Sequence, residues 1–422
     1  MGSLAGGTAE SPRQHRSFDQ SGYQKMAADT RCDTSAVARW LTQGARSAGQ
    51  PADVLKQLCE QLVTCGIPLW RVSVFVRTLH PQVMGRRFSW QLDTGVSISE
   101  AGYERLDDDI YRMSPVVHVY NSGMPLRRRL AARDCPIDFA VLDDFRTEGI
   151  TDYLASPLLF TNGEVHAVTW ATLRPGGFSD GHIAGIENIV APLSRVIEVY
   201  GLRHSASILL DTYVGHQAGE RILSGRIRRG DYEAIHAIIW LSDMRGFTAL
   251  ADTLPPAVLI ELLNSYFDCQ VPAILDCGGE ILKFMGDGML AIFPVASNAA
   301  DLPHACGKAL AAACEVRAKI AAADALVRIG VGGGARFGLA LHVGEVLYGN
   351  IGSGNRLDFT CIGPAVNLAA RLEELTRETG YPILASGEFA RHCAPRMVPV
   401  GEFSLRGFSA LQPVFALAEG TG

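Results

Sequence analysis

Three segments in the second half of the chain combine an apolar run with a turn that holds glycine and acidic residues. The first is the run 234–241, which leads into the turn 242–248. The second, residues 278–293, is divided by a Gly-Asp-Gly turn at Asp287, and the third covers residues 338–352. Apolar runs bounded by glycine predict strands, and Asp-Gly is a frequent hairpin turn. The pattern predicts one strand followed by two strand–turn–strand units, which favours an α+β fold for this half of the chain.

Two aspartates occupy the turns of the first two segments. Asp243 follows an apolar strand and precedes a glycine turn and a helix start, where a carboxylate can bind a metal ion. Asp287 lies at the tip of the predicted hairpin. Each aspartate also has a purely structural interpretation as the alternative to metal binding. Asp243 could cap its turn, and Asp287 could form part of a tight hairpin turn. If the two strands lie side by side in one sheet, the two carboxylates can share metal ions.

A third candidate is the helix predicted to begin at Pro364, because proline is favoured in the first helical turn. Asn367 and Arg371 are four residues apart and therefore project from one face of this helix. Their neighbours are mostly leucine, alanine and valine. We expect this polar pair to face the interior and to contact a ligand.

In combination these elements resemble the catalytic domain of the class III nucleotidyl cyclases over residues 233–418. The matching stretches are WLSDMRGFT, GGEILKFMGDGMLAIF, GLALHVGEVLYGNIG and LDFTCIGPAVNLAARLEELT. The resemblance implies a ferredoxin-like domain over residues 231–420. It also implies a reaction in which the ribose 3′-hydroxyl of a nucleoside triphosphate attacks its own α-phosphorus and pyrophosphate leaves.

The resemblance also assigns roles to individual residues. Asp243 and Asp287 match the family's metal-binding aspartates, which hold two divalent ions, Mg²⁺ or Mn²⁺, and the backbone carbonyl of Met244 would add a ligand. Asn367 matches the residue that orients the ribose, and Arg371 the one that stabilises charge on the phosphate. The backbone amides expected to hold the phosphates belong to Gly246, Phe247 and Thr248.

Base choice is expected to depend on Lys283 and Thr360. Adenine offers an acceptor at N1, to which a lysine can donate, and a donor at N6, from which a threonine hydroxyl can accept. Guanine reverses this edge, so the pair favours ATP over GTP. A guanylyl cyclase and a catalytically silent nucleotide-binding regulatory protein stay as alternatives.

Three positions depart from the commonest family pattern. Thr360 stands where many adenylyl cyclases of this class have aspartate, and the Lys/Thr pairing resembles a subgroup that includes bicarbonate-responsive enzymes. Bicarbonate is therefore a hypothetical partner. Pro364 replaces a common aspartate, and Phe408 stands where some relatives carry a phosphate-contacting lysine, which leaves Arg406 as the nearby basic residue.

The family's active site forms between two catalytic domains, one supplying the metal-binding aspartates and the other the base-selecting pair, the asparagine and the arginine. This chain contains one such domain with both halves, so the resemblance implies a homodimer. A seam of apolar residues at alternating spacings of four and three would be a natural dimer contact, with packing of the helix on its own domain as the alternative. The seam consists of Ile186, Val190, Leu193, Ile197 and Tyr200.

The first half of the chain has a different pattern. Residues 35–66 have helical periodicity, and residues 71–77 alternate as a strand does. Apolar runs on both sides of Asn162-Gly163 predict a hairpin, and a helix is expected from about residue 180. This order resembles a GAF-like sensor domain. The expected organisation is a disordered tail (1–30), the GAF-like α/β domain (35–200), a helical linker (201–230) and the cyclase domain (231–420).

Composition limits the remaining classes of function. Lysine and arginine number 38 against 44 aspartate and glutamate, a net charge of −6, which argues against a nucleic-acid partner. No apolar run reaches about 18 residues, and no secretory signal is recognisable, so we expect no membrane span and a cytoplasmic protein. The ten cysteines include no CxxC pair, which argues against a zinc ribbon. The arginine run 127–129 is expected in an exposed loop, with an anion site as the alternative.

Overall fold

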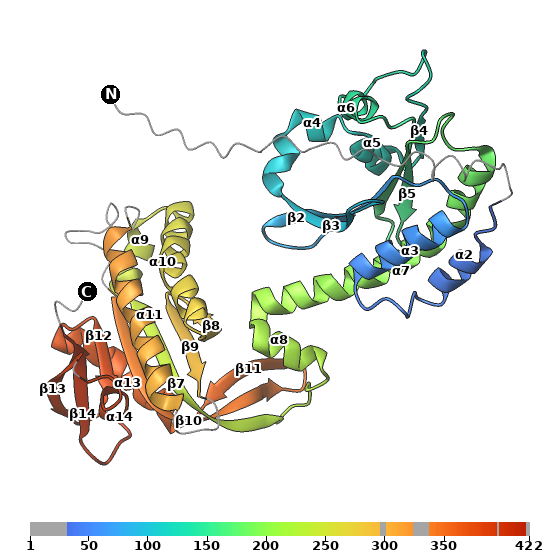
Figure 1. The fold of residues 1–422 in the computed structure, drawn as a ribbon. Coiled ribbons are helices and arrows are strands. Elements are labelled where there is room, and N and C mark those ends of the chain that lie inside the picture. Colours follow the sequence, from blue (N-terminus) through green and yellow to red (C-terminus); the bar gives the residue numbers. More distant parts are fainter. Residues whose placement is uncertain (1–31, 296–300, 324–336, 395, 419–422) are drawn as a thin grey trace, which may run out of the picture. The chain divides into compact units, whose positions relative to one another are not determined.

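The computed structural model divides into two compact units, residues Met1–Ile208 and Leu209–Gly422 (Figure 1). It describes residues 32–295, 301–323, 337–394 and 396–418. The predicted disordered tail, residues 1–30, lies outside this described part.

The N-terminal unit is built on a six-stranded antiparallel sheet in the order β3-β2-β1-β6-β5-β4. Helices α2, α3 and α7 bury one apolar cluster with β1 and β6, and α5 and α6 bury a second with β5 and β6. The strands are β1 (Arg71–Arg77), β2 (Val83–Gln91), β3 (Gly95–Gly102), β4 (Leu126–Arg128), β5 (Asp152–Leu159) and β6 (Val165–Thr172). The helices are α2 (Ser35–Thr42), α3 (Pro51–Thr64), the 3-10 helix η1 (Tyr103–Asp107), α4 (Asp109–Arg112), α5 (Pro115–Ser122), α6 (Val141–Thr147) and α7 (Asp180–Val214).

The predicted strand at residues 71–77 and the hairpin around Asn162-Gly163 are confirmed as β1 and the pair β5 and β6. The predicted helical region 35–66 is confirmed as α2 and α3. That this unit is GAF-like stays a prediction.

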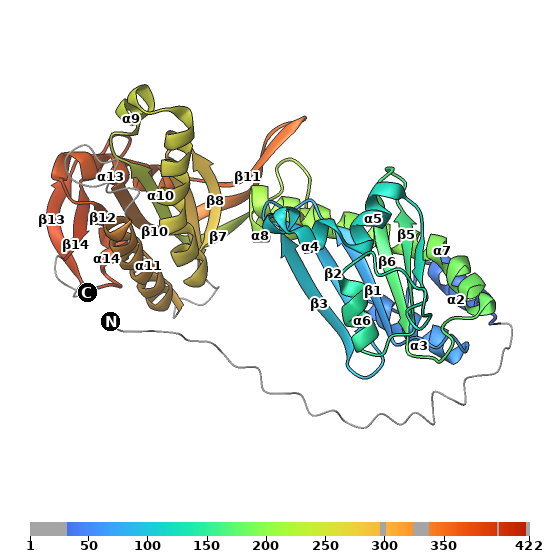
Figure 2. The same cartoon turned by 90° about the horizontal axis from the view of Figure 1, so that it is seen from above.

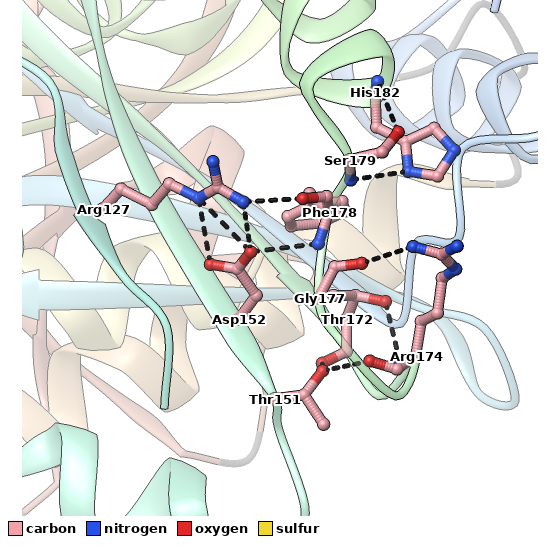
Figure 3. A network of polar contacts seen from close by, with 9 residues as sticks. All are labelled: Arg127, Thr151, Asp152, Thr172, Arg174, Gly177, Phe178, Ser179 and His182. Carbon is pink, nitrogen blue, oxygen red and sulfur yellow. Dashed lines mark hydrogen bonds and ion pairs between the residues drawn. The ribbon is translucent and has the colours of Figure 1, made fainter. Parts of the chain in front are cut away.

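The expectation of an exposed loop holds for Arg129 but is wrong for Arg127 and Arg128, which lie half-buried in β4. Arg127 lies in β4, and its Nη2 is 2.6 Å from Oδ2 of Asp152, a fully buried carboxylate (Figure 3). The same carboxylate accepts a hydrogen bond from the backbone of Phe178 (3.0 Å), whose carbonyl accepts one from Arg127 (2.7 Å). A buried charge needs such partners. Arg127 is therefore a structural residue that joins β4 and β5 to the segment before α7.

Of the two interpretations of the apolar seam, the structure supports packing within its own domain rather than a dimer contact. In α7, Ile186 and Leu193 are fully buried and Ile197 is 5% exposed, all within the core of the N-terminal unit. Val190 and Tyr200 pack against the same cluster. Spacings of three and four occur equally in a helix that packs on its own sheet, so periodicity alone does not identify the partner.

The helical linker lies partly within the C-terminal unit. Helix α7 continues to Val214, Gly215 turns the chain at φ +90°, and α8 (His216–Leu223) follows. The boundary between the two units, at residues 208/209, falls inside α7 rather than near residue 230. Ala218 of α8 is fully buried against the C-terminal sheet.

The C-terminal unit contains an eight-stranded sheet in the order β13-β14-β12-β10-β7-β9-β8, with β11 paired to β10. Helices α10 and α11 cover one face of the sheet, and α13 packs on the other (Figure 2). The strands are β7 (Tyr232–Met244), β8 (Glu280–Met285), β9 (Gly288–Pro294), β10 (Phe337–Ser353), β11 (Arg356–Ile362), β12 (Ile383–Ser386), β13 (Met397–Phe403) and β14 (Gln412–Leu417). The helices are α9 (Phe247–Thr253), α10 (Pro256–Asp276), α11 (Leu302–Ala322), α13 (Pro364–Thr379) and α14 (Gly387–Ala390).

Within this sheet the central order β10-β7-β9-β8 arises from a β-α-β-β-α-β chain path, which is the expected ferredoxin-like arrangement. The predicted hairpin at Asp287 is confirmed as β8 and β9. The predicted turn inside residues 338–352 is wrong, because β10 is one continuous strand that pairs with β7 from Phe337 to Gly349. Gly349 permits close approach there, since a Cβ would lie 2.1 Å from the carbonyl oxygen of Asp231.

Helix α10 meets, by length and composition, the criterion for a membrane-crossing helix, which no other helix in the described ranges does. Its residues Tyr266, Ala273 and Ile274 are fully buried in the core that α10 forms with α11 and the sheet. Core helices commonly meet the same criterion, so this is weak evidence for a span.

A buried histidine is expected to make the C-terminal unit sensitive to acid. Burial, with the nearby His236, lowers the pKa of His342 to about 4, and Ser386 Oγ lies 2.8 Å from its Nδ1. Between about pH 6.5 and 4 the unfolded chain binds a proton that the folded chain does not, so stability falls as the pH falls through this window. Hydrogen exchange of β10 amides at about pH 7 and about pH 5 measures the loss.

A His342→Asn variant should lose most of this pH dependence. His304→Asn, which alters an exposed histidine on α11, should keep it. An equal pH response in wild-type and His342→Asn protein would contradict the assignment.

Candidate active site

The sheet brings Asp243 and Asp287 together. Asp243 lies near the end of β7, Asp287 lies in the turn between β8 and β9, and β7 pairs with β9 so that Ser242 faces Met289. A Cβ on Gly288 would lie 3.1 Å from the carbonyl oxygen of Ser242 and 3.4 Å from Asp243 Oδ1. The glycine therefore lets the hairpin tip lie close to β7, as the shared-metal hypothesis requires.

The carboxyl group of Asp287 is perturbed by its surroundings. Burial, and then the negative charge of Asp243, raise the pKa of Asp287 to about 6. Two crowded carboxylates favour a cation between them, and their oxygens are the ligands that Mg²⁺ and Mn²⁺ prefer. In the described ranges no group of three or more His, Cys, Asp or Glu side chains has an arrangement that could by itself hold a metal ion. Any metal here would thus need further oxygens, such as the Met244 carbonyl and the substrate.

Two arginines that sequence reasoning did not single out contact Asp243. Arg377 of α13 donates from Nη2 to Asp243 Oδ2 at 2.7 Å, and Arg245 Nη1 lies 4.0 Å from the same oxygen. Arg245 also pairs with Glu373, Nη2 to Oε1 at 2.8 Å. The contact of Arg245 with Asp243 could have been predicted, because both residues belong to the stretch WLSDMRGFT. Arg377 gave no such signal, because it is 134 residues from Asp243 along the chain. Since the Arg377 side chain is 61% exposed, a metal ion can displace it without burying its charge.

Space for the Arg245–Glu373 pair comes from Gly338 on β10. A Cβ there would lie 1.9 Å from Arg245 Nη2 and 2.5 Å from Glu373 Oε1. The buried guanidinium can occupy this place only because position 338 has no side chain. The glycine is thus part of the support for the carboxylate site.

The expected phosphate-binding residues Gly246, Phe247 and Thr248 lie at the start of the seven-residue helix α9, separated by one residue from the end of β7. Gly246 has φ +78°, in the left-handed region, which permits the sharp change from strand to helix. The backbone amides of residues 246–248 are therefore close to Asp243 along the chain.

The proposed base-selecting residues lie on two strands that contact each other through Lys283. Lys283 on β8 lies 3.6 Å, Nζ to Oδ2, from Asp358, and Asp358 and Thr360 are both on β11. Thr360 is 5% exposed, and its hydroxyl has no hydrogen-bond partner among the described residues. A buried hydroxyl without a partner is costly, which is consistent with a ligand that completes it.

The expectation that Asn367 and Arg371 face the interior was wrong. Asn367 is exposed, and the Arg371 side chain is 33% exposed and paired with Glu374 at 2.7 Å. Helix α13 buries its other face against the sheet, including Leu368 and Leu372. No hydrogen bond or ion pair within the described ranges joins either residue to the carboxylate pair. Arg406 is exposed, and it too has no hydrogen bond or ion pair to the carboxylate pair within the described ranges. Phe408 packs against the apolar cluster beneath α13.

No model of a known protein family matches the chain. An adenylate cyclase from Anabaena cylindrica is 34% identical over 156 residues, 36% of this chain and 30% of that protein. The solved adenylyl cyclase CyaB from P. aeruginosa is 26% identical, with a TM-score of 0.40, and the match covers 45% of this chain and 96% of that one. The solved guanylyl cyclase Cya2 is 26% identical, with a TM-score of 0.39, covering 45% and 97%. The chain spans about a third of the length of the curated relatives it matches.

Proposed function

The C-terminal unit of this chain belongs to the class III nucleotidyl cyclases, and we propose that the protein is an adenylyl cyclase that converts ATP to 3′,5′-cyclic AMP and pyrophosphate. The observation that carries the proposal is the pair of crowded carboxylates, Asp243 near the end of β7 and Asp287 in the turn that leads into the neighbouring strand β9 of a ferredoxin-like sheet. The similarity to the Anabaena adenylate cyclase supports the same reaction class.

The carboxylate pair would hold two divalent metal ions, Mg²⁺ or Mn²⁺, with the backbone carbonyl of Met244. When bound, such ions supply positive charge that favours the ionised 3′-hydroxyl and stabilises the triphosphate. The amides of Gly246, Phe247 and Thr248 would bind phosphate oxygens beside them.

For the base, Thr360 would accept a hydrogen bond from adenine N6 and Lys283 would donate to N1. The buried hydroxyl of Thr360, for which the described part of the chain offers no hydrogen-bond partner, supports this role. The Lys283–Asp358 contact shows that the lysine reaches the strand that carries Thr360.

Bicarbonate sensitivity, suggested by the Lys283/Thr360 pairing, is a separate proposal. Unchanged cyclic AMP formation on adding bicarbonate at fixed pH would exclude it.

We further propose that the enzyme works as a homodimer, with Asn367 orienting the ribose and Arg371 stabilising phosphate charge in the partner's site. The exposure of both side chains supports this, because an exposed face can meet a second chain. An N-terminal GAF-like sensor would regulate the reaction.

The proposal is tested by incubating the full chain with ATP or GTP and either Mg²⁺ or Mn²⁺ and measuring both cyclic products. We expect cyclic AMP from ATP as the main product. Cyclic GMP as the main product would identify a guanylyl cyclase, and ATP binding without any cyclic product would identify a regulatory protein; either result overturns the proposal.

A Thr360→Val variant is expected to lose about tenfold to a hundredfold in its preference for ATP over GTP, because valine cannot accept from adenine N6. The measurement is the ratio of kcat/KM values for the two nucleotides. Thr64→Val, an exposed position on α3, serves as the control and should keep the wild-type ratio. An unchanged ratio in Thr360→Val would remove Thr360 from base selection.

A further inference from the structure

A cationic and aromatic cluster lies between α8 and the strands that carry the proposed base-selecting pair. The guanidinium of Arg221 on α8 lies 4.8 Å from the ring centroid of Tyr348 on β10 and 5.8 Å from that of Phe359 on β11. The two rings meet edge to face, with centroids 4.7 Å apart. Tyr348 is 1% exposed and Phe359 9% exposed, so the cluster belongs to the packed interior of the C-terminal unit.

The register of β10 and β11 relates this cluster to Thr360. Tyr348 pairs with Cys361, and Thr360 pairs with Gly349. Side chains alternate along a strand, so Phe359 and Cys361 share one face and Thr360 points to the other. The rings thus hold β11 on one side, while the Thr360 hydroxyl projects on the other side, opposite a residue without a side chain.

The same cluster holds the strand of Lys283. The hydroxyl of Tyr348 donates to Glu280 Oε1 at 2.6 Å, and Glu280 lies on β8, three residues before Lys283. Burial raises the pKa of Glu280, while the bond from Tyr348 and the charge of Arg221 act in the opposite direction. Tyr348 therefore connects β8 to the β10–β11 pair.

Arg221 is itself held by an ion pair. Its Nη2 lies 2.5 Å from Oε1 of Glu233 on β7, and its side chain is 25% exposed. Arg226 also reaches Glu233, Nη1 to Oε2 at 3.6 Å, but is 65% exposed and has no ring contact among the described residues. The two arginines thus share one carboxylate, and Arg221 alone of the pair stacks on the rings.

We propose that Arg221 is a positioning residue for base selection, acting through Tyr348 and Phe359 to keep Thr360 and Lys283 at the spacing that distinguishes adenine from guanine. This inference rests on the proposed adenylyl cyclase function. A planar guanidinium can stack flat on aromatic faces while its edge binds a carboxylate, whereas a tetrahedral ammonium group has no flat face and packs less closely on the rings. Loss of the stack would let β11 shift, and small displacements of recognition groups weaken discrimination strongly.

The test compares Arg221→Lys with Arg226→Lys in the full chain. Both keep the positive charge near Glu233, and only the first loses a ring contact. Arg221→Lys should lower the ratio of kcat/KM for ATP to that for GTP about fivefold to tenfold, mainly by raising KM for ATP. Arg226→Lys should keep the wild-type ratio. Calorimetric binding of Mn²⁺ without nucleotide should be the same in all three proteins.

Two further measurements make the outcome decisive. The affinity for a non-hydrolysable ATP analogue, relative to its GTP counterpart, should fall in Arg221→Lys by the same factor, and Tyr348→Phe should shift it in the same direction. Melting temperatures identify any variant that fails to fold. An unchanged ratio and KM in Arg221→Lys, an equal effect in Arg226→Lys, or a loss confined to kcat would overturn the positioning role. Wild-type protein that binds the analogue but makes no cyclic product would instead overturn the proposed function, while the binding ratio still tests Arg221.

Discussion

Replacing Asp287 by asparagine is expected to reduce cyclic nucleotide formation about a thousandfold or more, because the metal ions lose one of their two carboxylate ligands. Asparagine keeps the shape of the side chain and so leaves the turn between β8 and β9 intact. The measurement is product formed per enzyme at saturating ATP, with calorimetric titration of Mn²⁺ to follow the metal. Metal binding should weaken in parallel with activity.

The same substitution should stabilise the metal-free protein. The pKa of Asp287 is raised from the ordinary value of 3.8 to about 6 in the folded protein. Ionisation of this carboxyl group therefore destabilises the folded state progressively as the pH rises through this range, and the destabilisation is complete at neutral pH. Removing the charge relieves the repulsion from Asp243. We therefore expect a higher melting temperature in Asp287→Asn together with lost activity, a combination that is typical of functional sites.

Asp268→Asn provides the matched control, since Asp268 is an exposed aspartate on α10. It should change neither activity nor metal binding. If Asp287→Asn kept its activity, the two-metal site would be in the wrong place. If it lost activity and also melted at a lower temperature, the carboxylate would have a structural role instead.

The position of the carboxylate pair could be predicted because the information is local. A strand that ends at Asp243 and an Asp-Gly turn at Asp287 are visible in short stretches, and the ferredoxin-like order makes β7 and β9 neighbours. The role of Arg377 could not be predicted in this way, because its contact with Asp243 depends on how α13 lies across the sheet.

Other features were mispredicted because one pattern has two physical meanings. The glycines of β10 suggested a turn, but Gly349 serves a close approach of the backbone to Asp231. The apolar seam of α7 suggested a partner helix, but it is covered by its own unit. Helical spacing correctly placed Asn367 and Arg371 together, but not on a buried face, because apolar neighbours do not tell which side of a helix packs on the sheet.

The exposure of Arg371 leads to the prediction with the second largest effect. Arg371→Ala should abolish turnover as Asp287→Asn does, because arginine would stabilise charge on the phosphate in the transition state. Its partner Glu374 is 58% exposed, so the fold should be unaffected. Arg391→Ala removes a similar exposed ion pair, with Glu388 at 3.0 Å and the same spacing of three residues, and should stay active.

Mixing the two inactive variants distinguishes a shared site from a site within one chain. In a homodimer with two equivalent shared sites, each mixed dimer has one site with both defects and one with none. Random pairing of equal amounts makes about half of the dimers mixed, so activity should recover to about a quarter of wild type. A site within one chain would instead give no recovery. Mixed dimers, identified by two different affinity tags, that form in the expected amount without activity would therefore overturn the shared-site arrangement while leaving the carboxylate site in place.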